Sequence, residues 1–423
     1  MTVPFSFVHC ADLHLDSPFE GLQRVAPEIA AHLRQATFRA FDHVIDLAIS
    51  EGADFIIVAG DVHDGENRSL QAQLRFRQGL ARAADAGRQC FVAHGNHDPL
   101  SGWEARLSLP PTVVRFGGEE VEAYPARRRG ETLAQVYGLS FPVREVKTNL
   151  AAAFQRQAPA PFAIGVLHAN VGGDLHHDNY APCTLEDLSR AGMDYWALGH
   201  IHAQRILRDR EPCVIYPGNP QGRSWREQGP RGCYLVQVDE RGGINPRFVA
   251  TDVVRWFLRD ADVSSLETWD DLLDGLFAVR EEVRAAAAGR AAILRVQLIG
   301  RGELHRELWR RIDPERDLAE PLRAGEADRA DFVWVEAVEN RTRPPLDLEQ
   351  RRGVQDFVGD FLNAAAALRE QENPGAGLQE ILQQRPGHRL IARQLEDLGP
   401  DELLGLLADA ETLGLDRLLA EEE

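Results

Sequence analysis

The chain has 423 residues, with 66 acidic and 47 basic side chains and a formal net charge of −19. This length is enough for two or three domains with sizeable cores. No apolar run approaches the roughly 18 residues that span a bilayer, and the N-terminus lacks a basic segment followed by an apolar one. The composition therefore predicts a globular cytoplasmic protein with no membrane segment.

Cysteine and lysine counts exclude several classes of site. The five cysteines are widely spaced and form no CxxC pair, which argues against a disulfide framework or a thiolate zinc site. Lys147 is the only lysine and follows no glycine-rich loop, so a Walker A phosphate loop is excluded. The GxSxG and GxGxxG patterns are also absent.

The charge is unevenly distributed along the chain. Residues 1–250 carry 25 basic and 29 acidic side chains, a net charge of −4, whereas residues 251–423 carry 22 and 37, a net charge of −15. An acidic surface weighs against nucleic-acid binding, because phosphate contacts require cationic groups. That objection applies mainly to the C-terminal part.

The first 250 residues alternate strand-like and helical patterns. Apolar residues at helical spacing predict helices over Glu28–Ser50 and Ser69–Ala86. The run Ala53–Ala59, apolar except for Asp54, is typical of a strand buried on both faces. Further strands are predicted at Phe5–His9, Gln89–Ala93, Thr112–Phe116, Glu120–Tyr124, Ala134–Leu139, Ala163–Leu167, Tyr195–Leu198, Cys213–Tyr216 and Gly232–Val238. This pattern predicts an α/β domain over residues 1–250, with two stacked sheets flanked by helices.

The pattern changes after residue 250. A small α+β domain is predicted over residues 251–340, with helices at Ser264–Ala288 and Glu303–Arg311 and strands at Ala292–Ile299 and Asp331–Val338. The prolines of Asn340–Pro345 predict a linker. Beyond it, Leu346–Gln371 is predicted to be one helix and Leu378–Glu423 further leucine-rich helices, so residues 346–423 form a helical C-terminal region.

Five short polar segments each follow a predicted strand. They are Asp12-Leu13-His14, Gly60-Asp61, Gly95-Asn96-His97-Asp98, His168 and Gly199-His200-Ile201-His202. Strand carboxyl ends are where α/β sheets present ligand-binding groups. Carboxylate, amide and imidazole donors without thiolates suit Mn, Fe or Zn. Seven candidate ligands are too many for one tetrahedral zinc and fit two metals that share a carboxylate, a clamp suited to displacement at phosphorus.

The order of these segments resembles the calcineurin-like metallophosphoesterase superfamily. Within it, the details are most similar to the SbcD-like DNA-repair exonucleases, and most of all to the bacterial YhaO group. The runs that support this are His9–Leu22, Leu167–Gly173, His177–Cys183, Tyr195–Ala203 and Tyr216–Val236. The resemblance covers about residues 4–250 and extends more loosely to 340. It implies a four-layer α-β-β-α sandwich, a small α+β capping domain and a helical C-terminal tail. The tail, residues 346–423, is expected either to dock a partner ATPase or to pack as an internal helical bundle.

The resemblance also implies roles for the polar residues. One metal would be held by Asp12, His14, Asp61 and His202, and the other by Asp61, Asn96, His168 and His200. His97 matches the catalytic histidine, which contacts the phosphate or protonates the leaving oxygen. Asp98 is expected to orient the His97 imidazole through a hydrogen bond. The attacking group would be a metal-bound hydroxide, so no covalent intermediate is implied.

The expected function is a dinuclear-metal phosphodiesterase, with Mn²⁺ as the first choice and Fe, Zn or Mg as alternatives. The resemblance implies a DNA exonuclease or endonuclease in DNA repair, working with an SMC-like ATPase that has coiled-coil arms, and a homodimer is another expectation. Two alternatives stay open. One is a phosphatase or phosphodiesterase acting on a small molecule or nucleotide, and the other is a non-catalytic regulatory subunit of the ATPase.

Residues beside the motifs have weaker signals. His9, His63 and His94 are expected to pack or hydrogen-bond locally, and Asp16 and Asp64 either support the site or act as solvated or capping carboxylates. Arg223, Trp225 and Arg226 could grip a nucleic-acid backbone and stack a base, or form an ordinary surface loop. His177–Tyr180 could line the substrate cleft, and Arg127-Arg128-Arg129 is expected to be a solvated loop or a phosphate contact.

Overall fold

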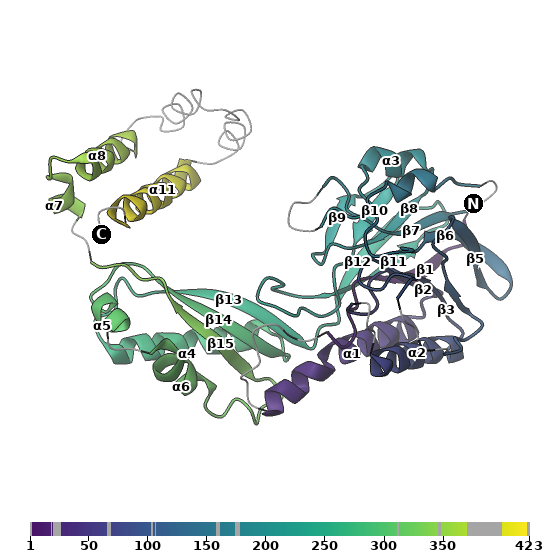
Figure 1. The fold of residues 1–423 in the computed structure, drawn as a ribbon, viewed down its shortest axis with the longest axis horizontal. Helices are drawn as coiled ribbons and strands as arrows, with labels where there is room; N and C mark the ends of the chain where they lie inside the picture. The colour runs from purple at the N-terminus through teal and green to yellow at the C-terminus, as the bar shows by residue number, and fades with distance from the viewer. Residues whose placement is uncertain are drawn as a thin grey trace. The chain divides into compact units, whose positions relative to one another are not determined.

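The computed structural model divides the chain into two compact units (Figure 1). One contains Met1–Ile299 and Glu307–Arg341, and the other contains Gly300–Arg306 and Thr342–Glu423. The boundary expected at residue 250 falls inside the first unit and stays a prediction. The described residues are 2–17, 19, 27–65, 69–102, 105, 107–157, 161–173, 178–310, 313–345, 348–369 and 400–420. Among them, none of the helices is long and apolar enough to cross a membrane.

The first sheet has the strand order β12-β11-β1-β2-β3-β4. Its strands are β1 (Phe5–Cys10), β2 (Phe55–Ala59), β3 (Gln89–Ala93), β4 (Val113–Arg115), β11 (Gly232–Val238) and β12 (Ile244–Ala250). The strands β1 to β4 are parallel to one another. Strand β11 pairs antiparallel with β1, and β12 pairs antiparallel with β11. The parallel part aligns the carboxyl ends of β1, β2 and β3 at one edge of the sheet.

The second sheet has the strand order β5-β6-β7-β8-β10-β9. Its strands are β5 (Glu122–Arg128), β6 (Glu131–Leu139), β7 (Ala163–His168), β8 (Tyr195–Gly199), β9 (Arg205–Arg208) and β10 (Cys213–Tyr216). The four central strands are parallel, and the edge strands β5 and β9 are antiparallel to their neighbours. The sequence pattern missed β9 and β12, which lie at sheet edges.

Helices cover the outer faces of the two sheets (Figure 1). One core cluster lies between the sheets and includes Phe7, Phe55 and Tyr195. A second cluster packs α1 (Pro27–Ser50) and α2 (Leu70–Asp85) against the first sheet, and a third packs α3 (Leu185–Arg190) against the second. The predicted four-layer α-β-β-α sandwich is confirmed, and α3 is an addition that the sequence pattern did not give.

A third sheet follows the sandwich. It contains three parallel strands, β13 (Val254–Asp262), β14 (Ala291–Ile299) and β15 (Val333–Asn340), of which β13 was not predicted. The helical elements of this region are α4 (Trp269–Ala286), α5 (His305–Arg310), a π-helical turn at Pro314–Ala319 and α6 (Glu320–Arg323). A cluster that includes Ile29 and Leu33 of α1 with Trp256 and Trp334 joins this sheet to the first layer of the sandwich.

The second unit contains α7 (Leu348–Arg352), α8 (Phe357–Arg369) and α11 (Pro400–Ala420). The prediction of one helix over Leu346–Gln371 is wrong, because the helix ends at Arg352 and a new one begins at Phe357. Asp356 lies between them, accepts the Gly359 N–H at 2.8 Å and is 2.7 Å from Arg351, so it caps α8 and ties it to α7. The helices predicted over residues 378–399 and 421–423 lie outside the described residues.

Candidate metal centre

Polar residues gather where strands of both sheets end. Asp12 follows β1, Asp61 follows β2 and Asn96 follows β3, all in the first sheet. His168 is the last residue of β7 and His200 follows β8, in the second sheet. A direct contact joins the two edges, since His168 Nδ1 lies 3.1 Å from the carbonyl oxygen of Ala59. The sandwich therefore brings together motifs that are far apart in sequence.

The backbone at these strand ends is strained. Asp12, His14, Asp61 and His200 all have positive φ angles, of 52°, 42°, 49° and 105°. Non-glycine residues adopt such angles rarely and at a cost of about 1–3 kcal/mol each. Strain of this kind persists where the surrounding structure holds it and is concentrated at functional sites. Four of the predicted ligands therefore have strained backbones, which indicates a functional site at these strand ends.

Two motif glycines permit the close packing around His168. A Cβ atom on Gly60 would lie 2.3 Å from His168 Nδ1. A Cβ atom on Gly95 would lie 2.3 Å from Asp61 Oδ1 and 2.8 Å from the His168 ring. Any side chain at these positions would push the imidazole or the carboxylate away, which explains why both motifs carry glycine.

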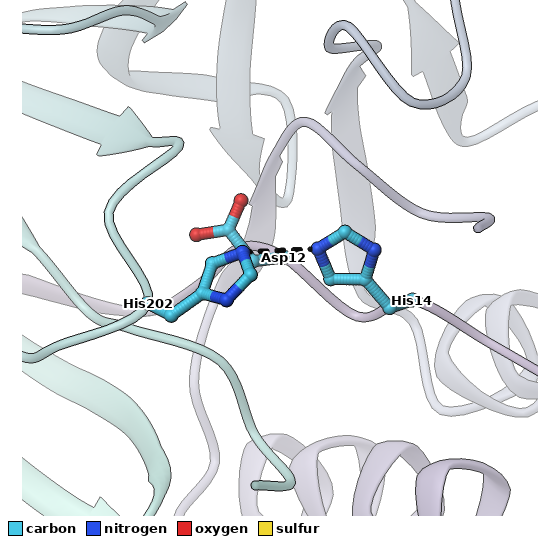
Figure 2. Close-up of side chains that lie close together, drawn as sticks. All are labelled: Asp12, His14 and His202. Atoms are coloured by element: carbon cyan, nitrogen blue, oxygen red, sulfur yellow. Dashed lines mark hydrogen bonds between the residues drawn. The ribbon is translucent and has the colours of Figure 1, made fainter. Parts of the chain in front are cut away.

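One group of donors consists of Asp12, His14 and His202, whose ligand atoms all lie within 4.8 Å of one another. Figure 2 shows the rings of His14 and His202 meeting from opposite sides, with Asp12 beside them. The two Nε2 atoms are 3.1 Å apart. His14 Nε2 is also 3.9 Å from Asp61 Oδ2.

A second group consists of Asp12, Asp61 and His168, all fully or almost fully buried. His168 Nε2 lies 3.2 Å from Asp61 Oδ2 and 3.0 Å from Asn96 Oδ1. His168 Nδ1 lies 3.7 Å from Asp12 Oδ1. Asp12 thus belongs to both groups, and Asp61 of the second group lies beside His14 of the first.

Burial and neighbouring charges shift the titration of these side chains. Burial raises the pKa of Asp12 and lowers that of His14 to about 3. Burial alone would lower the pKa of His168, but the Asp61 and Asp12 carboxylates outweigh it and raise the pKa to about 9. Burial would raise the pKa of Asp61, but His168 holds it well below its usual range. Asp61 and His168 thus favour a negative carboxylate beside a positive charge, which a bound cation would also supply.

His97 lies beside this cluster with its ring partly exposed. Its Nδ1 is 3.2 Å from Asp64 Oδ1, and its backbone N–H donates to Asp61 Oδ1 at 2.9 Å. The same Asp64 oxygen is 3.2 Å from His14 Nδ1, and Ser17 Oγ donates to its other oxygen at 2.8 Å. Burial would raise the pKa of Asp64, but the two imidazoles outweigh it and hold the pKa far below its usual range.

Asp98 contacts the loop that carries His97. Asp98 is buried, and its carboxylate accepts the N–H groups of Gly95 and Val62, each at 2.9 Å. It also lies 2.9 Å from His94 Nδ1. Asp64 contacts the His97 ring, and the orienting role of Asp98 toward that ring stays a prediction. Asp98 holds together the loop that presents Asn96 and His97.

His202 has a partner that the sequence did not reveal. Glu227 Oε1 lies 2.6 Å from His202 Nδ1, and the other oxygen accepts from the Arg223 N–H at 2.7 Å and from Asn219 at 3.0 Å. Carboxylates that orient a ligating imidazole are common around metal sites. Nothing in the local pattern marks Glu227, because 25 residues, including strands β9 and β10, separate it from His202.

Arg223 lies between the two supporting carboxylates. Its Nη1 donates to Ser17 Oγ at 2.9 Å and is 3.6 Å from Asp64 Oδ1, and its Nη2 is 3.7 Å from Glu227 Oε1. Its side chain is only 16% exposed, so it does not belong to an ordinary surface loop. Trp225 differs, because Arg295 stacks on its ring at 4.9 Å and Arg226 at 5.5 Å.

His200 is placed differently from the other predicted ligands. Its backbone N–H donates to both Asp12 oxygens at 3.0 and 3.2 Å, while its ring Nε2 lies 2.7 Å from the Asp178 carbonyl oxygen. Its ring centroid is 5.2 Å from that of His168 and 6.1 Å from that of Tyr180. Of the expected cleft residues, Asp178–Tyr180 therefore border the site, and His177 lies outside the described residues.

The histidines expected to act locally do so. His9 Nδ1 lies 2.9 Å from the Tyr195 hydroxyl and its Nε2 3.2 Å from the Leu198 carbonyl oxygen. The His63 ring packs edge-on against Phe76. His94 pairs with Asp98, as described above. These three rings support the surrounding loops.

The donor chemistry fits divalent metals. The cluster offers carboxylate, imidazole and amide donors, and all five cysteines are buried as free thiols with none of them in it. Buried carboxylates are costly unless a positive charge offsets them. The ligand roles of the individual residues stay predictions at this point.

Comparisons with known proteins agree with this site. Residues 5–204 match the profile of the calcineurin-like phosphoesterase family, and residues 256–343 match that of the metallophosphoesterase YhaO middle domain. The chain is 36% identical over 416 residues to the "Uncharacterized metallophosphoesterase YhaO" of Bacillus subtilis, with 98% of both chains covered. This protein belongs to the calcineurin-like metallophosphoesterase family.

Two further relatives are similar to part of this chain. The DNA double-strand break repair protein Mre11 of Aeropyrum pernix is 27% identical over 226 residues, covering 50% of this chain and 52% of that protein. A subunit of the nuclease SbcCD from Bacillus subtilis is 25% identical over 264 residues, covering 52% and 63%. The metallophosphoesterase is therefore similar to a DNA double-strand break repair protein and to a nuclease subunit over about half of its length.

Proposed function

We propose that this metallophosphoesterase hydrolyses phosphodiester bonds in DNA. The observation that carries the proposal is the buried cluster of carboxylates and imidazoles at the carboxyl ends of both sheets, with His97 beside it. The Mre11 and SbcCD similarities support DNA as the substrate class. Hydrolysis follows from the type of site, whereas DNA follows from relatives that match only half of the chain.

Two divalent ions fit the donor set, and we propose Mn²⁺ for both. Asp12, His14, Asp61 and His202 would hold one ion, and Asp61, Asn96, His168 and His200 the other. When bound, such ions lower the pKa of water and neutralise charge on a phosphoryl group. Asp64 and Glu227 fix the orientation of the His14 and His202 imidazoles from behind.

His97 is the proposed catalytic residue. Because Asp64 contacts its Nδ1, the ring is held with Nε2 as the remaining polar atom. From this position it would donate a proton to the leaving oxygen or a hydrogen bond to the phosphate. Asp98 acts as a positioning residue, since it binds the backbone of the loop that carries His97.

Arg223 is the proposed contact for the substrate phosphate. Its guanidinium nitrogens lie 3.6 Å from Asp64 Oδ1 and 3.7 Å from Glu227 Oε1. Both distances are longer than those of a hydrogen bond. A guanidinium at that distance can turn toward a non-bridging phosphate oxygen and bind it with two hydrogen bonds. Arg223 would thus supply a positive charge to the substrate phosphate, although the chain as a whole is strongly acidic.

We further propose that the protein works with an SMC-like ATPase and forms a homodimer, in keeping with the similarity to a protein named as a subunit of SbcCD. The acidic excess of residues 251–423 leads us to expect weak DNA binding by the isolated chain. Tight, salt-resistant DNA binding by the isolated chain would contradict that expectation.

The test compares wild type with His97→Ala, using Mn²⁺, duplex and single-stranded DNA, and bis-p-nitrophenyl phosphate. We expect wild type to cleave both classes of substrate and His97→Ala to lose about 10²–10⁴-fold in rate. Cleavage of the small ester with no attack on DNA, alone or with the partner ATPase, would instead support a small-molecule phosphodiesterase. No cleavage of either substrate would support a non-catalytic regulatory subunit.

A further inference from the structure

A second concave site lies at the opposite end of the sandwich from the metal cluster. It has a volume of about 990 Å³ and is lined by Pro4–Ser6, Gly52, Asp54, Gly87, Arg88, Arg127–Arg129, Gln237–Asp239 and Gly243–Asn245. These residues sit at the amino ends of β1, β2 and β3 and at the adjoining ends of β5, β11 and β12. Ser6 lies near the amino end of β1, whereas Asp12 follows its carboxyl end. At about 3.3 Å per residue, six residues of extended chain span about 20 Å. We call this site the arginine pocket.

Four arginines line the arginine pocket, and one of them is already neutralised. Arg128 donates to both oxygens of Asp54, at 2.6 and 2.7 Å, and to the Pro4 carbonyl oxygen at 2.9 Å. The lining also contains Asp239, whose carboxylate accepts the N–H groups of Arg241 and Gly243 at 2.8 and 2.7 Å. Both acidic groups of the lining are therefore engaged.

The other three arginines have no acidic partner among the described residues. Arg88, Arg127 and Arg129 form no ion pair there, although the chain has 66 acidic side chains. Arg88 Nε is buried and has no hydrogen-bond partner within the described part of the chain. A buried donor without a partner costs about 1–3 kcal/mol, so an acceptor supplied by a ligand would remove that cost. The expected solvated loop at 127–129 is in fact the end of β5 and its turn.

The remaining lining is mainly polar. Phe5 and Val238 are buried in the core, Ile244 is partly exposed, and the exposed Gln237 and Asn245 are paired residues of β11 and β12. A volume of about 990 Å³ lies at the upper end of the range for small-ligand sites. Guanidinium groups bind phosphate through two parallel hydrogen bonds.

We propose that the arginine pocket binds a phosphate-bearing ligand of up to nucleotide size, independently of the metal centre. Arg88 and Arg129 contact the phosphoryl oxygens, Arg127 adds charge, and the Arg128–Asp54 pair forms a fixed wall. The ligand source is either inorganic phosphate or a nucleoside monophosphate, which share the phosphoryl group. This proposal does not depend on the nuclease assignment, because the two sites use different residues.

Calorimetric titration of the full chain in EDTA tests the proposal, with inorganic phosphate, deoxyadenosine monophosphate and adenosine as probes. EDTA and a parallel Asp61→Asn variant remove phosphate binding at the metal centre. We expect saturable binding of the two phosphate probes and none of adenosine. Arg88→Gln/Arg129→Gln should weaken binding about tenfold or more, since each lost charged hydrogen bond has a large effect. Arg210→Gln, an exposed arginine elsewhere, is the matched control.

Asn245→Asp keeps every arginine and adds a negative charge at the rim, so it should also weaken binding while the fold stays intact by circular dichroism. Tighter binding of the nucleotide than of inorganic phosphate would identify the nucleotide as the ligand, and equal binding would identify phosphate. No saturable binding up to about 10 mM overturns the proposal. Binding of the phosphate probes that disappears in Asp61→Asn but survives in the arginine variant also overturns the proposal.

Discussion

Replacing Asp64 by asparagine gives the sharpest test of how the metal centre is supported. One oxygen of this carboxylate lies 3.2 Å from both His14 Nδ1 and His97 Nδ1, and the other accepts from Ser17. Asparagine keeps the size of the side chain but has a single acceptor oxygen and no charge. Its amide can therefore satisfy only part of this network.

The size of the effect follows from the contacts that are lost. A hydrogen bond to a charged group contributes about 1.5–3 kcal/mol. If one imidazole contact is lost, the activation free energy of hydrolysis rises by that amount. The rate then falls about 10- to 150-fold. Carboxylates that orient ligating histidines give effects of about 10–100-fold, so the two arguments agree.

The assay is Mn²⁺-dependent hydrolysis of bis-p-nitrophenyl phosphate, with kcat and KM measured separately. We expect Asp64→Asn to lower kcat, and Asp64→Glu to recover part of it because the charge returns. Asp16→Asn is the matched control, because Asp16 is exposed and has a φ of 67°, which asparagine tolerates. Activity of Asp64→Asn within about twofold of wild type would refute the assigned role.

Three further substitutions test other parts of the structure. Gly95→Ala should lower the bound metal per chain, measured by mass spectrometry, because its Cβ would meet the His168 ring; full metal content would contradict the packing argument. Arg223→Gln should raise KM for DNA about tenfold, whereas Arg226→Gln should change it little; equal effects would remove the phosphate role of Arg223. Leu362→Ala, at a fully buried position of α8, should destabilise the second unit by about 2–5 kcal/mol in urea unfolding, and Phe357→Ala, which is 71% exposed, should not; similar midpoints would contradict the observed core.

The sequence predicted the central strands well. Ala53–Ala59 was predicted from its mainly apolar run, and all five residues of β2 are buried. The missed strands have weaker patterns for clear reasons. Strand β9 has four residues at a sheet edge, and β13, also at an edge, contains several charged residues, among them Arg255 and Arg259. Edge strands need less apolar surface, so periodicity does not reveal them.

The break between α7 and α8 shows another limit. The apolar pattern of 346–371 fits one helix, but Asp356 stabilises a new helix start through its contacts with Gly359 and Arg351. A carboxylate that accepts a backbone N–H can start a new helix where the chain could otherwise continue the old one. Which of the two forms depends on whether the following turn offers a backbone N–H to that carboxylate.

By itself the sequence determined the family motifs, the donor types of the metal centre and the buried strands that carry them. These features are local, because strand burial and the chemistry of a side chain are written in neighbouring residues. Only the tertiary structure decided which carboxylate contacts which imidazole: Asp64 for His97, and Glu227 for His202. It also decided that Arg88 meets Arg127–Arg129 at the far end of the sandwich. Such contacts join residues far apart in the chain, and their distances exist only once the sheets have packed.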